Sequence, residues 1–254
     1  MPIPTLTETM NAHRNDQTLK DNGGLHLLDN PIWNSLRTGH ASFAMGNEQA
    51  RRFPAAIGPL SGIADESPES YAPLRELAGP GGIVVLFYPR PFSVPEGWTL
   101  VRGGLLSQMV CESPAAPAPF SLEPGAELRP LTSEDVTAMV ALAELTEPGP
   151  FRERTIELGK FWGIFHAGQL VAMSGQRLHL PQAVEVSAVC THPDARGRGY
   201  ARLLIAKVVE DITQRGKTAF LHSFADNHSA IRVYESLGFK LRRHLHLGVL
   251  KNEL

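Results

Sequence analysis

The sequence contains only two cysteines, Cys111 and Cys190, and they lie far apart in the chain. This excludes a disulfide scaffold and a cysteine-built zinc site, and it suits a reducing compartment. Neither sign of charge predominates, since 24 Lys and Arg stand against 26 Asp and Glu. A chain without a basic excess offers no broad field for a phosphate backbone, so we expect no nucleic-acid partner.

Long apolar runs are also missing. No stretch of eighteen apolar residues occurs, so we expect no membrane span. The first twenty residues are polar and lack the apolar segment of a secretory signal. These absences together predict a cytoplasmic protein. The chain does have 43% hydrophobic residues over 254 positions, which suffices for one large or two modest domains.

Prolines mark the clearest division of the chain. Residues 113–125 hold four prolines among alanines, which is typical of an extended linker. We therefore expect an N-terminal α/β domain over 1–112 and a second domain over 126–254. The first domain should contain a short helix and two strands, at 71–77, 82–88 and 98–111. The last of these runs has two adjacent glycines at its centre and is expected to form a broken strand.

After the linker the pattern is clearer. Thr132 and Asp135 form a capping box that predicts a helix start. Expected strands lie at 128–131, 161–165, 170–174, 184–191, 218–223 and 239–249. Two further helices are expected from Ala201 to Ile212 and from His228 to Leu237, with Asn227 as the cap of the second. On the first of them, Lys207, Asp211 and Gln214 are expected to face solvent.

The turn after the 184–191 strand is the most informative feature. Arg196-Gly197-Arg198-Gly199-Tyr200 is short, basic and glycine-bearing, and the helix pattern begins directly after it. The first N–H groups of a helix have no intrahelical partner and lie at the positive end of its dipole. Glycines let a phosphate group approach the backbone closely. The turn therefore predicts a site for a phosphorylated ligand.

Two blocks of sequence resemble one known family. Arg196-x-x-Gly199-x-Ala201 is similar to the phosphate turn of the GNAT acetyltransferase superfamily. Residues 227–239 resemble its second signature, with Asn227, Ala230, Tyr234, Glu235, Leu237, Gly238 and Phe239 at matching positions. The resemblance covers about 127–251 and implies a mixed, mostly antiparallel sheet with flanking helices. For the N-terminal half, a diverged second copy of this fold stays an open alternative.

The resemblance implies acetyl-CoA as co-substrate and no metal. Backbone N–H groups of the turn would hold the pyrophosphate, and the preceding strand would splay from its neighbour to admit the pantetheine arm. The N–H of Val189 would polarise the thioester carbonyl, and Asn227 would face the cofactor as well as cap its helix. The implied cofactor-binding residues are Val189, Thr191, Arg196, Gly197, Arg198, Gly199, Tyr200, Ala201 and Asn227.

Two residues are candidates for proton transfer. Tyr234 is the candidate general acid for the departing thiolate, against the alternative of a packing tyrosine. Glu185, eleven residues before Arg196, is either a base for the amine or a solvated strand carboxylate. Cys190 and His192 lie two apart and would share a strand face, but no third group orients them, so a structural cysteine is the favoured interpretation.

These features predict direct attack of a primary amine on the thioester of acetyl-CoA. The acceptor would be a small molecule, an amino acid or a peptide, and the N-terminal domain would shape its pocket. Positioning would supply most of the rate enhancement, and acid–base groups would supply the smaller part. The alternative from another class is a non-catalytic acyl-CoA-binding or protein-interaction module. The sequence makes no prediction of the oligomeric state.

Overall fold

A computed structural model describes residues 19, 26–115 and 120–254 of the chain. The expectations for the polar first twenty residues and for the centre of the proline-rich linker therefore lie outside the described residues, Leu19 excepted. Of the helices in the described ranges, none combines the length and apolar character that a bilayer span needs.

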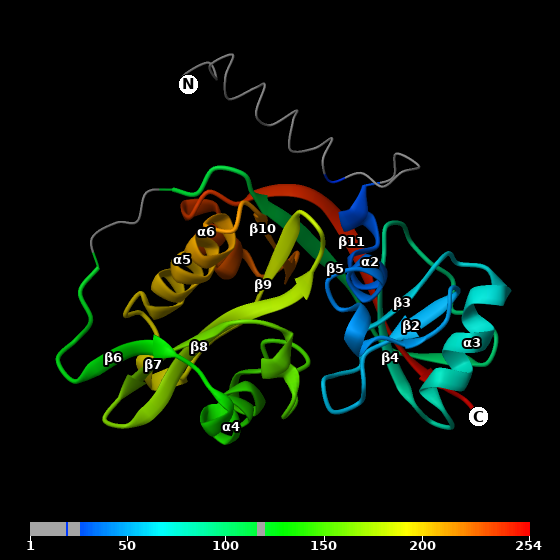
Figure 1. The fold of residues 1–254 in the computed structure, drawn as a ribbon, viewed down its shortest axis with the longest axis horizontal. Coiled ribbons are helices and arrows are strands. Elements are labelled where there is room, and N and C mark those ends of the chain that lie inside the picture. Colours follow the sequence, from blue (N-terminus) through cyan, green and yellow to red (C-terminus); the bar gives the residue numbers. More distant parts are fainter. Residues whose placement is uncertain (1–18, 20–25, 116–119) are drawn as a thin grey trace, which may run out of the picture.

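One eight-stranded sheet runs through the molecule (Figure 1), in the order β4-β11-β5-β10-β9-β8-β7-β6. Its strands are β4 (Ile83–Tyr88), β5 (Trp98–Cys111), β6 (Ala126–Pro130), β7 (Phe161–His166), β8 (Gln169–His179), β9 (Ala183–Thr191), β10 (Thr218–Phe224) and β11 (Lys240–Asn252). The pair β9–β10 is parallel, and the other six neighbouring pairs are antiparallel. The predicted mixed, mostly antiparallel sheet is thus confirmed.

Helices cover both faces of this sheet. The helices are α2 (Pro31–Arg37), α3 (Pro68–Ala78), α4 (Val136–Thr146), α5 (Tyr200–Thr213) and α6 (His228–Ser236). Short 3-10 turns lie at Leu27–Asp29, Ala41–Phe43, Ser133–Asp135, Thr155–Leu158 and Pro193–Ala195. A small sheet comprises β1 (Met45–Gly46), β2 (Ala50–Arg52) and β3 (Ser61–Ile63). Because side chains alternate along β8 and β9, α5 and α6 pack on one face and α4 on the other (Figure 1).

The strand β5 is continuous, so the expected break at its glycines is wrong. Gly103 and Gly104 stay in register with β11, opposite Gly248 and Leu247. A Cβ at Gly104 would lie only 2.9 Å from the ring of Phe224, which explains the glycine by close packing from β10. The glycine pair therefore makes room for a neighbouring aromatic ring and does not end the strand.

The sheet contains strands from both sides of the linker. Strand β5 precedes the linker in the chain, yet it lies between β10 and β11, which both follow it. One end of β5 pairs with β10 over 106–111, and its whole length pairs with β11. Strand β4 then adds to the far edge of β11. The two halves thus share one hydrogen-bonded sheet, as the long crossing ribbons in Figure 1 show.

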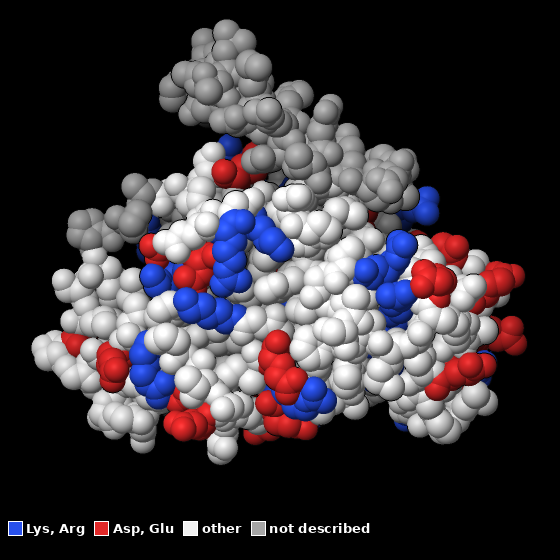
Figure 2. All heavy atoms as spheres, viewed as in Figure 1, with Lys and Arg blue, Asp and Glu red and all other residues white. Residues whose placement is uncertain are grey.

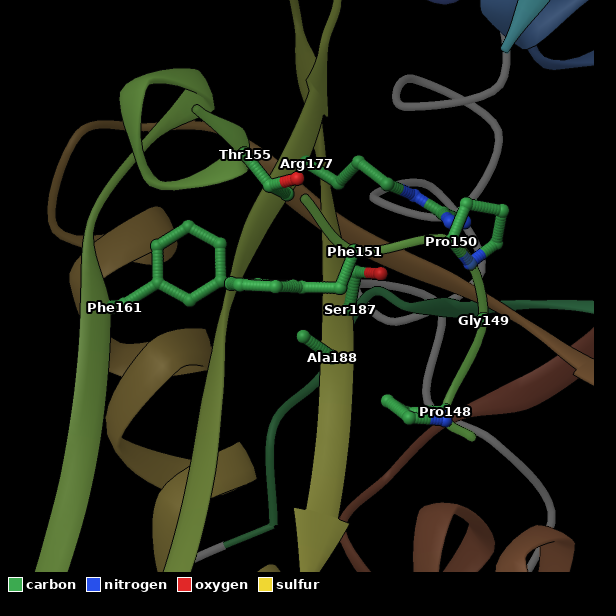
Figure 3. Close-up of a pocket in the computed structure, with 9 residues that line it drawn as sticks. All are labelled: Pro148, Gly149, Pro150, Phe151, Thr155, Phe161, Arg177, Ser187 and Ala188. Atoms are coloured by element: carbon green, nitrogen blue, oxygen red, sulfur yellow. The ribbon is translucent and has the colours of Figure 1, made fainter. Parts of the chain in front are cut away.

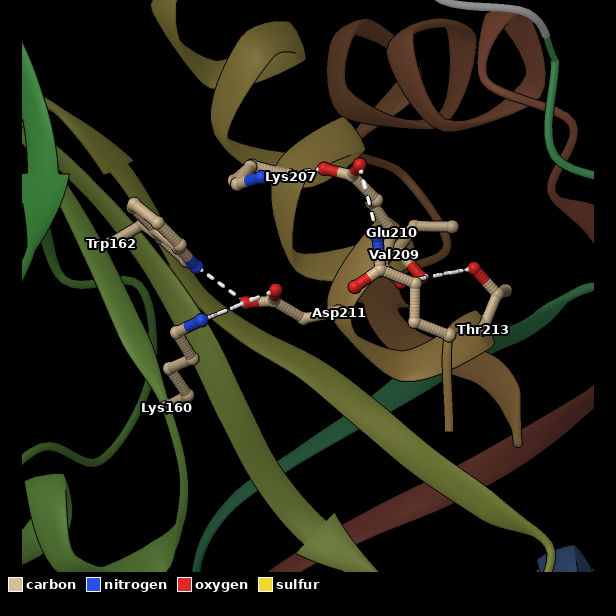
Figure 4. Close-up of polar contacts among 8 residues, drawn as sticks. Lys160, Trp162, Lys207, Val209, Glu210, Asp211 and Thr213 are labelled. Atoms are coloured by element: carbon tan, nitrogen blue, oxygen red, sulfur yellow. Dashed lines mark hydrogen bonds and ion pairs between the residues drawn. The ribbon is translucent and has the colours of Figure 1, made fainter. Parts of the chain in front are cut away.

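Helix α5 is fixed to the sheet by a buried carboxylate, which corrects one sequence expectation. Asp211 does not face solvent: it is 7% exposed and accepts a hydrogen bond of 2.6 Å from the indole Nε1 of Trp162. Lys160 lies 3.1 Å from the same carboxylate (Figure 4). Trp162 also has Lys160 and Lys207 over its ring. The helix that begins at the glycine turn is therefore held against β7.

A shared sheet predicts that residues 120–254 do not fold alone. Without β5, the edges of β10 and β11 would lose their common partner, so we expect no cooperative thermal unfolding transition from this fragment by circular dichroism. Supplying residues 1–115 as a separate polypeptide should restore the transition. A fragment that unfolds cooperatively on its own, at a temperature close to that of the full chain, would show two independent domains.

Candidate active site

The strands β9 and β10 separate after three residue pairs. The pairing joins residues 183–185 of β9 to residues 218–220 of β10, and it does not continue beyond them. Yet β9 runs on to Thr191 and β10 to Phe224. The edge of β9 that faces β10 is therefore free of sheet hydrogen bonds over its second half. This is the gap between strands that the resemblance implies.

A bulge redirects β9 beside this gap. Between the pairs Ser187–Gly175 and Cys190–Met173, β9 has one more residue than β8. Ala188 has a φ of 51°, a left-handed conformation that non-glycine residues rarely adopt. Such a residue turns the next peptide group away from the regular ladder. Val189, whose N–H the resemblance assigns to the thioester carbonyl, directly follows it.

The glycine turn presents a row of unpaired backbone donors. Gly197 has a φ of 78° and Gly199 a φ of 76°, both in the left-handed region that favours glycine. No backbone N–H from residues 197 to 202 donates to another described residue, and α5 has no side-chain cap. The Oγ1 of Thr191 is likewise buried without a partner in the described chain. These unpaired groups, together with the dipole of α5, favour an anion at the turn.

The side chains of the turn have different roles. Arg198 pairs with Glu123 at 2.5 Å, so its guanidinium is already engaged. The ring of Tyr200 is buried in the core, which leaves only its N–H for a ligand. Arg196 is exposed and makes no ion pair with another described residue. In Figure 2, lysines and arginines lie over the region of α5 and α6, with acidic residues among them.

One side of the turn is open and the other is contacted by the end of the linker. A Cβ at Gly197 would meet nothing within 4 Å. A Cβ at Gly199 would come within 2.8 Å of the ring of Phe120, which itself is 38% exposed. The linker thus borders the turn without closing its open side.

Tyr234 and Asn227 both lie where the second signature predicts. The ring of Tyr234 packs with Phe239 and the apolar residues beneath α5, and burial raises the pKa of its hydroxyl to about 12. That hydroxyl makes no hydrogen bond to another described residue. Asn227 caps α6, because its side chain accepts from the N–H of Ala230 at 3.2 Å. The capping prediction is confirmed, and the amide nitrogen of Asn227 is left for another partner.

Glu185 is neither solvated nor free to act as a base, and this corrects the sequence interpretation. Its side chain is fully buried and receives two hydrogen bonds of 2.7 Å from Arg177. His222 adds a third of 2.7 Å. Burial raises the pKa of this carboxyl, but Arg177 and His222 outweigh that effect and lower it to about 2. Such a weak base is unsuited to deprotonating an amine, so Glu185 is a positioning residue.

The hydrogen-bond network assigns the tautomer of His222. Arg242 donates to the amide oxygen of Gln108, which turns the amide nitrogen of Gln108 toward His222. The Nε2 of His222 therefore accepts, and its Nδ1–H donates to Glu185. Glu185, Arg177 and His222 are here called the buried cluster.

Sequence reasoning did not find Arg177 or His222. The one available signal was an arginine close to the apolar residues Leu178 and Leu180, between two strands of the predicted sheet. Cys190, by contrast, follows the structural interpretation: it packs beneath α4, and burial raises the pKa of its thiol to about 11. His192 accepts a hydrogen bond from the N–H of Asp194, so it does not act on the cysteine.

A small pocket lies at the bulge, between β9 and the loop that follows α4 (Figure 3). It is lined by Pro148, Gly149, Pro150, Phe151, Thr155, Phe161, Arg177, Ser187 and Ala188. The loop is fastened to the N-terminal half, because Thr155 donates to the carbonyl of Ile57 at 2.8 Å and Arg154 donates to that of Ala56 at 3.1 Å. The N-terminal half therefore supports the loop that lines this pocket, although the lining residues themselves all lie in the C-terminal half.

Comparison with known proteins agrees with this geometry. The family model described as FR47-like protein matches residues 161–246. A candidate acetyltransferase of the GNAT family from Novosphingobium aromaticivorans is 39% identical, with a TM-score of 0.81, over 91% of this chain and 100% of its own. No curated protein matches the sequence.

More distant structures share the fold. A GNAT-family acetyltransferase from Colwellia psychrerythraea aligns with a TM-score of 0.51 at 14% identity, over 98% of each chain. A tandem GNAT protein from the clavulanic acid biosynthesis pathway aligns with a TM-score of 0.52 at 14% identity, over 80% of this chain and 78% of its own. The fold, the splayed strands and the glycine turn define an acetyltransferase architecture. The chain belongs to the GNAT family.

The buried cluster predicts a specific pH dependence of stability. The Glu185→Gln variant leaves Arg177 buried without its partner, which should lower the free energy of unfolding at pH 7 by about 3–5 kcal/mol. Because the folded pKa of Glu185 lies below its ordinary 4.5, the stabilisation is present above that value and is lost as the pH falls toward 2.

Urea unfolding of both proteins at pH 7, 5 and 3 measures this effect. The difference between wild type and variant should shrink by about 2 kcal/mol from pH 7 to pH 3. Glu157→Gln, which removes an exposed carboxylate from its pair with Arg154, is the control and should change stability little at any pH. A difference that does not vary with pH would show that folding leaves the pKa of Glu185 unchanged, and a difference that grows as the pH falls would show that Glu185 is protonated in the folded protein.

Proposed function

We propose that this protein transfers an acetyl group from acetyl-CoA to a primary amine of a small molecule, an amino acid or a peptide. The observation that carries the proposal is the gap between β9 and β10, which leads directly to the unpaired backbone donors of residues 197–202. We also infer a cytoplasmic location, since both cysteines are free and buried.

The residues around the gap fit the parts of coenzyme A. The N–H groups of the turn suit a pyrophosphate, because they have no partner among the described residues and the start of α5 has no side-chain cap. The exposed guanidinium of Arg196 suits a further phosphate. Thr191 and the free edge of β9 offer polar partners to the amides of the pantetheine arm. When bound, the cofactor supplies an activated acyl group and a thiolate leaving group.

Catalysis would depend mainly on position. Val189 follows the bulge, so its N–H can be aimed at the oxyanion that develops when the amine attacks the carbonyl carbon. Holding both reactants in line can supply an effective molarity of up to about 10⁵–10⁸ M. The pocket at Ser187 and Ala188 would receive the amine, and the N-terminal half would support the loop that lines it.

Proton transfer would be divided between the protein and solvent. Tyr234 would donate a proton to the departing thiolate, since its hydroxyl is free of any other described partner. None of the described residues lining the pocket is a carboxylate, so the amine would be bound neutral or would lose its proton to water. A non-catalytic acyl-CoA-binding module, the alternative left open by the sequence, is not favoured by membership of an acetyltransferase family.

Gly197 and Gly168 provide a matched pair of variants for the phosphate turn. Both have a φ of 78°, and a Cβ at either would meet no atom within 4 Å. Gly197→Ala and Gly168→Ala should therefore each cost about 1–2 kcal/mol of stability, from the left-handed conformation alone. Only Gly197→Ala places a methyl group where the pyrophosphate would approach. We expect it to weaken CoA binding by roughly tenfold or more, whereas Gly168→Ala leaves binding unchanged.

Isothermal calorimetry with CoA measures this difference. Equal affinities for the two variants would place the cofactor elsewhere. Gly199 is less suitable for this test, because a side chain there would also displace Phe120.

Tyr234→Phe tests the proton donor, since it keeps the buried ring and removes the hydroxyl. We expect kcat to fall by roughly 10²–10⁴-fold, the range of general acid–base catalysis, with little change in CoA affinity. Thiol release during acetylation of a panel of amines measures kcat, and calorimetry measures affinity. An unchanged kcat would remove Tyr234 from the mechanism.

A further inference from the structure

One nitrogen of Arg177 makes no hydrogen bond within the buried cluster. Its Nε and Nη2 donate to the two oxygens of Glu185, each at 2.7 Å. Its Nη1 makes no hydrogen bond to another described residue. A Cβ added to Gly149 would lie 3.9 Å from this nitrogen, which places the nitrogen at the wall of the pocket beside the bulge. The Arg177 side chain is 10% exposed. Its Nη1 is not among the polar atoms that are shut off from solvent and also lack a hydrogen-bond partner.

The pocket around this nitrogen is otherwise uncharged. Of the described residues that line it, Arg177 alone is ionisable, and the others are prolines, phenylalanines and small residues. A guanidinium in apolar surroundings binds a carboxylate more strongly than it would in water. Three of its five N–H bonds are not used by Glu185, two of them on Nη1, and one of these two can donate to a carboxylate oxygen. In Figure 3 the Arg177 side chain points from its strand toward Pro150, on the side where the pocket lies.

The size of the pocket limits the size of the acceptor. Arg177 and the bulge residues Ser187 and Ala188 line one small depression, whose empty volume of about 240 Å³ includes space open to solvent. A ligand that contacts both is therefore short, and an amine and a carboxylate separated by one or two carbon atoms form a compact acceptor of this kind.

We propose that the acceptor is a free α- or β-amino acid whose carboxylate binds the Nη1 of Arg177 while its amine reaches the bulge at Ser187–Ala188. This inference rests on the proposed acetyltransferase function and narrows its substrate class. Peptides and simple amines would lack the carboxylate at that position. Arg177 would then be a binding residue that selects the acceptor.

Glu185 explains how Arg177 can serve two carboxylates. It holds the Nε side of the guanidinium, so the plane of the group and the direction of Nη1 are fixed before a substrate arrives. The carboxylate of Glu185 is also bound by His222, whose Nδ1–H donates to it. A fixed donor loses less conformational entropy on binding than a free arginine would.

A second depression extends the site on the other side of Arg177. This depression shares three lining residues with the first pocket, namely Arg177, Pro150 and Thr155. Its other lining residues are apolar, and most of them come from the N-terminal half. These added residues are Phe53, Ile57, Gly58, Leu60 and Leu158. An apolar amino-acid side chain fits this surrounding better than a charged one, so we expect alanine, leucine or phenylalanine to be preferred over aspartate or lysine.

The experiment compares free amino acids with their primary amides, which keep the amine and lose the carboxylate charge. With the full chain and acetyl-CoA, we expect kcat/KM for alanine, leucine, phenylalanine or β-alanine to exceed that of the matched amide by roughly 10- to 100-fold, the effect of a charge-assisted hydrogen bond. Thermal shifts with CoA and N-acetylated amino acids, against N-acetylated amides, give a binding readout independent of turnover.

Arg177→Lys tests the residue itself while keeping a cation next to Glu185. It should abolish the preference for acid over amide, so that kcat/KM for each acid falls to that of its matched amide measured on the same variant, mainly through a higher KM for the acid. Arg129→Lys is the matched control, because Arg129 makes a similar two-bond pair with Asp135 away from the pocket. It should keep the preference. If Arg177→Lys does not fold, the comparison of acids with amides on the wild-type protein still tests whether the acceptor carboxylate is recognised.

The outcomes separate this inference from the proposed function. Acetylation of neutral amines or amides as fast as of amino acids would overturn the carboxylate site and leave the acetyltransferase intact. A preference for acids that survives Arg177→Lys would assign the carboxylate to another residue. An absence of CoA binding would overturn the proposed function itself.

Discussion

The arrangement of the candidate site depends on one buried ionic interaction. Arg177 on β8, Glu185 on β9 and His222 on β10 meet where β9 and β10 stop pairing. Below this point backbone hydrogen bonds hold the strands together, and above it nothing in the described sheet does. The buried cluster replaces the missing backbone bonds at the place where the sheet opens. It thereby fixes the position of the gap and the orientation of the arginine that borders the acceptor pocket.

The N-terminal half supports the pocket, although the residues that line it belong to the half that carries the two signatures. The loop after α4 is hydrogen-bonded to Ala56 and Ile57, and β5 completes the sheet behind the site. The phosphate turn, in contrast, is built entirely from local features, namely two left-handed glycines and the start of α5. The proposed cofactor site and the proposed acceptor site would thus have different structural origins in this chain.

Local chemistry could be predicted from the sequence, and long-range pairing could not. The capping box at Thr132, the cap at Asn227 and the hairpin between β7 and β8 each depend on neighbouring residues, and each is found in the structure. The partner of Glu185 and the inward position of Asp211 depend on residues far away in the chain, and both were misjudged. A charged residue on a strand or helix looks solvated until its partner is known.

The insertion of β5 between β10 and β11 has a consequence for how the protein is made. Trp98 pairs with Asn252, so the sheet cannot close until β11 has been synthesised. Until β10 and β11 have both been made, at least one edge of β5 remains available for wrong pairing. Ordering so distant a contact also makes folding slow relative to chains with local pairing.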